Sequence, residues 1–391
     1  MAEVAPAQPV VRRRRRAALI VLVPFLIAAL LHAYPWARLV LQPGWPTGPT
    51  AALTVLAVVL AVGLPAALLL GHGRGVRWAV GAGDLWLGVA WQLFVWTAVG
   101  ELVRLALLLA GLPDPARARV VAVVVLGWTV LILGWGAYRA LGPVPVRQLE
   151  VLIAGLGTGL SGLRIGHITD THLGPFLSRR WMRRITAQLN ALDVDVLAHT
   201  GDLVDGSLAH RARQVEPLGA ATARDARVFI TGNHEYFSGA QEWTEYMSSL
   251  GFTVLRNSHL VLRRGADDLV LAGIDDRTAA RSGVPGHGAD LDRALDGAPA
   301  GAPVVLLAHQ PRQVLDAVDR VDLQLSGHTH GGQLWPFHYL VRLDQPTLHG
   351  LSRHGARTQL YTSRGTGFWG PPFRIFAPPE IAVLTLRPAP P

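Results

Sequence analysis

Residues 163–172 read LRIGHITDTH, a strand-length apolar run that ends in Asp170 and His172. Similar runs recur toward the C-terminus and alternate with stretches patterned as helices. The expected strands are 163–169, 194–200, 227–231, 269–274, 303–308, 321–326 and 381–386, and the expected helices are 178–192, 207–224, 238–250 and 311–319. Alternation of this kind predicts an α/β domain, which we place at residues 161–388.

Polar clusters follow five of the expected strands. Because ligands of α/β sheets bind beyond the carboxyl ends of the strands, we expect these clusters to converge. Their candidate metal ligands are two Asp, four His and one Asn, namely Asp170, His172, Asp202, Asn233, His309, His328 and His330. Oxygen and imidazole ligands of this kind suit Mn²⁺, Fe or Zn²⁺. Seven ligands exceed the need of one ion, so we expect two divalent metal ions that share a carboxylate. Asp275 and Asp276 also follow a strand, where they form either a turn, the favoured interpretation, or hydrogen-bond partners of the metal ligands.

Two residue types are missing from the whole chain. It contains no Cys, which excludes disulfides, thiolate metal ligands and cysteine nucleophiles. It also contains no Lys, which excludes a P-loop lysine and Schiff-base chemistry. The sequence therefore leaves Asp, Asn and His as the groups that can hold metal.

Four long apolar runs fill the N-terminal third, at residues 17–34, 50–71, 85–111 and 118–141. Each has about the 20 residues that an α-helix needs to cross the hydrocarbon core of a bilayer. We therefore expect a transmembrane module of four helices at residues 17–142, preceded by a basic tail at 1–16. Pro143 and Pro145 end the last helix, and residues 143–160 are expected to form a linker.

The formal net charge of +9 belongs almost entirely to the membrane module and its tail. Residues 1–142 carry a net charge of +8, and residues 143–391 carry +1. A basic excess confined to the apolar part indicates membrane topology, so no nucleic-acid partner is expected. Nine Arg flank the runs on the side of the N-terminus and three on the other side. This asymmetry predicts a multi-pass protein of the plasma membrane whose C-terminal domain is cytoplasmic.

Two groups of charged residues leave alternatives open. Glu101 and Arg104 lie midway along the third apolar run, where they form either a functional pair or a structural i,i+3 ion pair. Four Arg lie on the expected helix 178–192, at positions 179, 180, 183 and 184. They form either a patch for anionic lipid headgroups or an ordinary solvated helix face.

The ordered series DTH, GDLVD, GNHE, AHQP and GHTHGGQ resembles the calcineurin-like metallophosphoesterases. It is most similar to their bacterial membrane-attached branch, which includes phosphodiesterases proposed to act on phospholipids. The later motif SRGTGFWGPP also looks like that branch. The resemblance covers about residues 160–390 and implies the fold of that family, two mixed β-sheets sandwiched between helices. The four apolar runs are not explained by it.

The resemblance also implies a role for each candidate residue. One metal ion would be held by Asp170, His172, Asp202 and His330, and the second by Asp202, Asn233, His309 and His328, with Asp202 bridging. Such ions lower the pKa of a bound water and so generate the hydroxide that attacks phosphorus. His234 would protonate the leaving oxygen, and Asp205 would orient the imidazole of His234.

We therefore expect a membrane-embedded phosphoesterase whose substrate is a lipid-linked phosphodiester or pyrophosphate. A first alternative is a membrane-tethered phosphodiesterase for nucleotides or other soluble phosphoesters. A second alternative is a transport or sensor protein whose metal domain is regulatory. The complete ligand set and His234 favour an enzyme.

Overall fold

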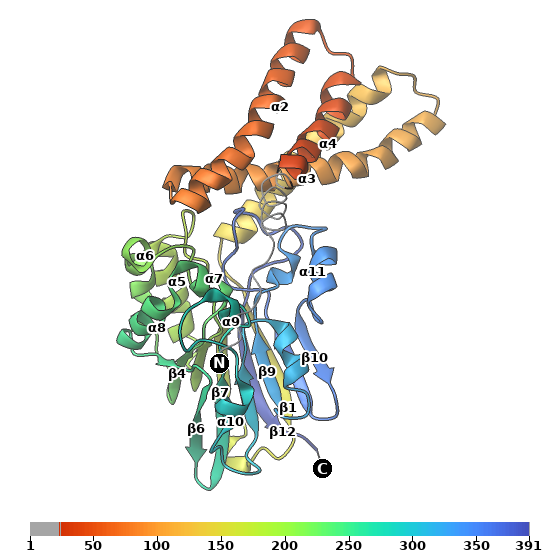
Figure 1. Ribbon diagram of the computed structural model, residues 1–391. Helices are drawn as coiled ribbons and strands as arrows, with labels where there is room; N and C mark the ends of the chain where they lie inside the picture. The colour runs from red at the N-terminus through yellow and green to blue at the C-terminus, as the bar shows by residue number, and fades with distance from the viewer. Residues whose placement is uncertain (1–22, 24, 391) are drawn as a thin grey trace, which may run out of the picture. The chain divides into compact units, whose positions relative to one another are not determined.

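The computed structural model describes residue 23 and residues 25–390. The chain divides into two compact units, Met1–Gly134 and Trp135–Pro391, shown in Figure 1. The predicted basic tail at 1–16 and the first residues of the apolar run at 17–34 lie outside the described residues.

The first unit is helical. Its long helices are α2 (Thr47–Leu68), which continues into the π-helical turn η2 (Leu69–Gly73), α3 (Arg77–Leu109) and most of α4 (Ala116–Leu141). All three are long and apolar enough to cross a membrane, which confirms the prediction of transmembrane helices. The described part of the first apolar run forms a shorter apolar helix, Phe25–Leu41, that ends in the π-helical turn η1 (Ala37–Leu41). Four spans therefore stay a prediction.

The charged residues inside α3 find partners on other segments. Arg38 Nε lies 2.9 Å from Glu101 Oε1, and the Tyr34 hydroxyl donates to the same oxygen at 3.3 Å. Arg104 pairs instead with Asp114 at 3.2 Å. Glu101 and Arg104 therefore do not form the i,i+3 ion pair that was one of the two alternatives, because each pairs with a residue farther away in sequence.

Two mixed sheets of six strands each form the second unit. The first has the order β1 (Val146–Ile153), β12 (Ile381–Pro388), β2 (Arg164–Ile168), β3 (Val196–His199), β4 (Ala226–Phe229) and β5 (Thr253–Val254). The second has the order β10 (Gly350–His354), β11 (Thr358–Thr362), β9 (Leu323–Ser326), β8 (Val304–Leu307), β7 (Asp267–Gly273) and β6 (Ser258–Arg264). The helices are α5 (Arg179–Asn190), α6 (Leu208–Val215), α7 (Asn233–Ser238), α8 (Ala240–Ser249), α9 (Ala279–Ser282), α10 (Leu291–Leu295) and α11 (His338–Asp344). Short 3₁₀ turns are η3 (Thr158–Leu160), η4 (Glu216–Ala220), η5 (Pro311–Asp316) and η6 (His330–Gly332).

The core of the second unit is built in layers. Fully buried side chains of both sheets, such as Ile165 and Leu325, share one cluster between the sheets. A second cluster joins the first sheet to Trp181 of α5 and Trp243 of α8. A third joins the second sheet to α10. Because each sheet buries one face on the other and one on helices, the predicted sandwich of two mixed sheets between helices is confirmed.

The strands that the sequence pattern misses lie at or near sheet edges. β1, with the sequence VRQLEVLI, forms an edge of the first sheet within the stretch expected as a linker, residues 143–160. β6 and β10 are the two edges of the second sheet. Edge strands alternate apolar and polar residues, so they do not show the continuous apolar runs of central parallel strands.

Parallel pairing brings the polar strand ends together. β2, β3 and β4 are parallel to one another, as are β7, β8 and β9. Gly201 lies in the loop that follows β3 and has a φ of +92°. A Cβ atom at this position would lie 2.3 Å from the Gly232 backbone nitrogen. Glycine at this position therefore allows the loops after β3 and β4 to touch.

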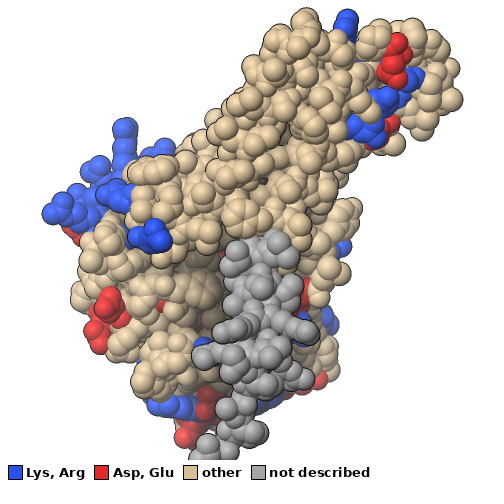
Figure 2. All heavy atoms as spheres, turned by 45° about the horizontal axis from the view of Figure 1, so that its top comes forward, with Lys and Arg blue, Asp and Glu red and all other residues tan. Residues whose placement is uncertain are grey.

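Helix α5 buries one face and exposes the other. Trp181, Met182 and Ile185 are buried, whereas the Arg at 179, 180, 183 and 184 are exposed. Figure 2 shows Arg side chains gathered over the edge of the second unit where α5 and α6 lie. The exposed positions of the four Arg are compatible with both interpretations of this helix face.

Candidate metal centre

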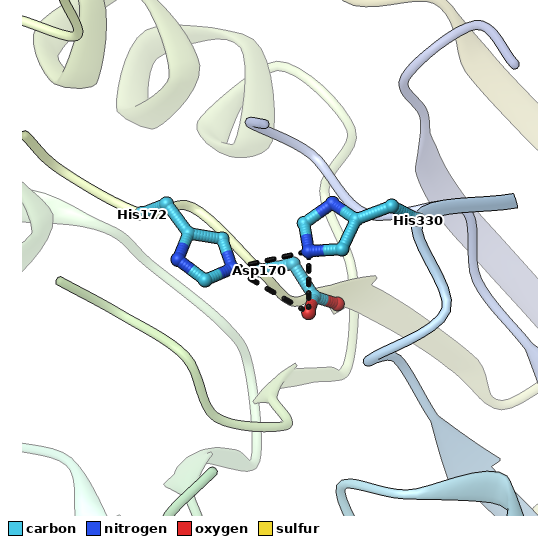
Figure 3. Close-up of side chains that lie close together, drawn as sticks. All are labelled: Asp170, His172 and His330. Carbon is cyan, nitrogen blue, oxygen red and sulfur yellow. Dashed lines mark hydrogen bonds and ion pairs between the residues drawn. The ribbon is translucent and has the colours of Figure 1, made fainter. Parts of the chain in front are cut away.

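Three of the candidate ligands meet from the two sheets. Asp170 and His172 follow β2, and His330 follows β9; Figure 3 shows their side chains turned toward one another. His330 Nε2 lies 3.4 Å from Asp170 Oδ1 and 3.1 Å from His172 Nε2. One ligand atom from each residue lies within 4.8 Å of the others, which is a spacing that suits one metal ion.

A second group of ligands lies beside the first. Asp202, His309 and His328 also bring one ligand atom each within 4.8 Å of one another. Asn233 Oδ1 joins them, 3.1 Å from His309 Nε2 and 3.0 Å from His328 Nδ1. All seven predicted ligands therefore converge at one place in the second unit.

Asp202 stands between the two groups. Its Oδ2 atom lies 3.1 Å from His309 Nε2 of the second group and 3.6 Å from His172 Nε2 of the first group. Burial alone would raise the pKa of Asp202, but nearby His309 and His234 hold it well below its usual range. An ionised, buried carboxylate that faces both groups has the position and charge of a bridging ligand.

The backbone of the ligand loops is strained. Five of the seven ligands have a positive φ, namely Asp170, His172, Asp202, His328 and His330. Residues other than glycine adopt this region at a cost of about 1–3 kcal/mol each, and such residues cluster at functional sites. The fold therefore holds these side chains in place against the preference of their own backbone.

Hydrogen bonds leave metal-binding nitrogens available. His309 Nδ1 lies 2.8 Å from the Thr200 carbonyl oxygen, a contact that turns its Nε2 toward Asn233 and Asp202. His172 Nδ1 lies 2.9 Å from Asp205 Oδ1, which turns its Nε2 toward His330 in the same way. Orienting bonds of this type accompany most metal-binding histidines. Together with the buried carboxylates, they show that the residues present fit divalent cations.

His234 lies directly beside this cluster. Its Nδ1 atom is 2.6 Å from Asp205 Oδ1, the same oxygen that contacts His172. Burial disfavours the charged form of His234, but the carboxylates of Asp202 and Asp205 outweigh it and raise its pKa to about 9. The imidazole is therefore held in a proton-donating form, and one carboxylate orients both a metal ligand and this group.

A buried glutamate ties the ligand loops together. Glu235, fully buried, accepts hydrogen bonds from the backbone N–H groups of Asp202, Leu203 and Gly232. Glu235 is the last residue of the GNHE motif, and the sequence alone predicts no role for it. Its contacts show that the last residue of this motif fixes the loop that carries Asp202.

Two further buried residues contact the ligand loops. Arg374 donates to the His330 carbonyl oxygen at 2.7 Å, and another of its nitrogens lies 3.3 Å from His330 Nδ1. Asp276, interpreted as part of a turn, is buried and accepts from Gln310, the neighbour of His309, at 2.9 Å. Arg374 lies 44 residues from His330 in sequence, so no local pattern indicates the contact.

Replacing the shared carboxylate should release both metal ions. We expect Asp202→Ala to lower the metal content from about two ions per chain to less than about one, because both sites lose an anionic ligand. Elemental analysis of the full-length protein after gel filtration measures this. An unchanged metal content in Asp202→Ala would refute the shared position.

Two further variants serve as controls for the metal content of Asp202→Ala. Asp268→Asn removes a partly exposed carboxylate that pairs with Arg263 at 2.7 Å, and it should keep both ions. Asp205→Asn removes the group that orients His172 without removing a ligand, so metal affinity should fall by about 10- to 100-fold rather than be lost.

Several known proteins are similar to this chain in sequence. Residues 163–332 match the calcineurin-like phosphoesterase family. The chain is 38% identical over 280 residues to a zebrafish (Danio rerio) "transmembrane protein with metallophosphoesterase domain", a match that covers 70% of this chain and 63% of that protein. It is 35% identical over 268 residues to an "uncharacterized metallophosphoesterase" of Helicobacter pylori, covering 67% of this chain and 70% of that protein. A bovine (Bos taurus) transmembrane relative is 35% identical over 314 residues, covering 77% of this chain and 68% of that protein. The chain therefore belongs to the calcineurin-like metallophosphoesterases, a metal-dependent family of phosphoesterases.

Proposed function

We propose that this membrane-associated phosphoesterase uses two metal ions to hydrolyse a lipid-linked phosphodiester or pyrophosphate. The observation that carries the proposal is the convergence of six candidate ligands around the seventh, Asp202, with His234 and Asp205 directly beside them. A complete ligand set next to an oriented acid is what hydrolysis of a phosphoester requires. A purely regulatory metal domain has no need of such an acid.

The side chains divide the work of hydrolysis. Divalent cations held by the two groups would activate water and neutralise charge on the phosphoryl oxygens. His234 keeps its Nδ1 proton on Asp205, so Nε2 is the atom that gives a proton to the leaving oxygen. Its raised pKa keeps it protonated near neutral pH. Asp205 holds the ring in this orientation and holds His172 at the same time.

Chain connectivity supports a lipid-linked substrate. The last turns of α4, which is long and apolar enough to span a membrane, belong to the second unit. The Arg374 backbone N–H donates to the Gly136 carbonyl oxygen there at 3.0 Å. The Arg374 side chain in turn donates to the His330 carbonyl oxygen, so this one residue joins the end of α4 to a candidate metal ligand. A site anchored in this way is suited to a substrate that also resides in the membrane.

Removing the proposed acid should harm poor leaving groups most. We expect His234→Ala to lower kcat by about 10²- to 10⁴-fold for an alkyl phosphodiester, and much less for a p-nitrophenyl ester, whose leaving group needs no proton. His234 acts in its protonated form, so the native rate should fall as pH rises through its pKa, and the variant should lack that fall. Steady-state rates across pH, with metal content measured in parallel, provide the comparison.

The exposed His210 of α6 supplies the matched control, and His210→Ala should behave as the native protein does. Equal losses for the alkyl and p-nitrophenyl esters in His234→Ala would exclude the role of proton donor.

A substrate panel tests the lipid preference. With Mn²⁺ added, we expect kcat/KM for a phospholipid or lipid pyrophosphate in mixed micelles to exceed that for a soluble phosphodiester by about tenfold or more, because uniform binding of the lipid portion raises kcat/KM. Equal values for lipid and soluble esters, nucleotides included, would instead support the tethered phosphodiesterase.

We further propose that the catalytic domain is cytoplasmic. Arg74 and Arg77 lie at the start of α3, and Arg139 and Arg147 lie at and after the end of α4. Because two spans separate these pairs of Arg, both pairs lie on the same side of the membrane, which we take to be the cytoplasmic side. Since the chain has no Cys, Leu152→Cys introduces a single thiol on the exposed edge of β1. A membrane-impermeant maleimide should label it only after the cells are permeabilised; labelling of intact cells would place the domain outside.

A further inference from the structure

Helix α11 has no buried residue. Three of its apolar side chains, Tyr339, Leu340 and Leu343, are each more than half exposed, and Leu343 reaches 82%. Residues 339 and 343 are four apart and 340 and 343 three apart, so the three side chains share one face of the helix. A helix that shows an apolar face to water indicates a surface that another apolar phase covers.

α11 is held firmly against the metal site. A Cβ atom on Gly332 would lie 2.5 Å from His338 Cα, so the first residue of α11 rests on the loop that carries His330. The Gln333 side chain donates to the carbonyl oxygens of Trp369 and Pro371 and accepts from the Trp369 backbone N–H. These bonds join the segment before α11 to the loop of residues 369–376.

The same loop packs on the end of α4. The Phe376 ring lies 5.8 Å from the Trp135 ring and 6.2 Å from the Trp335 ring, measured between centroids. Phe376, and Tyr138 on the last turns of α4, are also more than half exposed. Aromatic side chains at the end of an apolar helix are typical of the membrane–water interface.

We propose that these side chains form one interfacial belt, consisting of Trp135, Tyr138, Tyr339, Leu340, Leu343 and Phe376, that inserts into the headgroup region of the bilayer. The belt begins on α4, a helix long and apolar enough to span a membrane, and so it continues the surface that this helix would present to lipid. Arg342, exposed beside Leu343, supplies a positive charge for anionic headgroups. Lipid is therefore the occupant, rather than a second protein.

The belt sets the depth of the metal site. α11 starts against the His330 loop, and exposed Phe237 packs edge-on against His234 at 5.5 Å between ring centroids. With the belt inserted, the ligand loops lie at the level of the lipid headgroups, where a lipid-linked phosphate resides. This consequence rests on the proposed function, whereas insertion of the belt does not.

Single-cysteine labelling tests the insertion. The full-length chain has no native Cys, so Leu343→Cys can carry one environment-sensitive fluorophore. Leu152→Cys is the control, because Leu152 is also an exposed Leu and lies near the far end of β1, six residues, roughly 20 Å, from Val146, the first residue of that strand after α4. Both variants are reconstituted in vesicles of phosphatidylcholine and phosphatidylglycerol that contain lipids with a nitroxide near the headgroup.

We expect quenching by the nitroxide lipid to be at least about threefold stronger at position 343 than at position 152. Tyr339→Cys, on the same helix face, should agree with Leu343→Cys and guards against a local effect of one label. Equal, weak lipid quenching at 343, 339 and 152 would overturn the proposal, and so would shielding of 343 from both lipid and water-soluble quenchers, which indicates a protein partner. Because quenching needs no turnover, an inactive protein with a quenched label would contradict only the proposed function.

Discussion

Two carboxylates, Asp170 and Asp202, are buried at the carboxyl ends of neighbouring parallel strands, both within 4 Å of His172 Nε2. Negative charges removed from water close to one another destabilise a folded protein unless cations compensate them. Four histidines and one asparagine are arranged around this pair, and five of these seven residues have a positive φ. The sandwich of sheets is the scaffold that holds the loops in that arrangement, and metal ions are the natural source of the missing charge.

Three residues make the arrangement rigid, of which Glu235 and Arg374 are buried and Asp205 is partly exposed. Glu235 fixes the Asp202 loop through backbone N–H groups, Arg374 holds the His330 loop, and Asp205 orients His172. Asp205 also holds His234, so the proposed acid and the candidate metal ligand His172 share one hydrogen-bond acceptor. In the proposed mechanism, metal affinity and proton transfer are coupled through this oxygen atom.

The central strands and the convergence of the seven candidate ligands could be predicted from the sequence, because buried parallel strands are continuous apolar runs and each polar cluster follows one directly. β1 could not be predicted, because Arg147, Gln148 and Glu150 interrupt the apolar residues of this edge strand. Arg374 and the second contact of Asp205 could not either, since they depend on how loops distant in sequence pack. The ion pair of Glu101 could not be predicted for the same reason, because its partner Arg38 lies on another segment and not one helical turn away.

The central claim is that two cations share Asp202. Anomalous diffraction from crystals of the full-length protein grown with Mn²⁺ tests it most directly. The account predicts two peaks, one among Asp170, His172 and His330 and one among Asn233, His309 and His328, with Asp202 in contact with both. A single peak, or two peaks of which only one contacts Asp202, would contradict it.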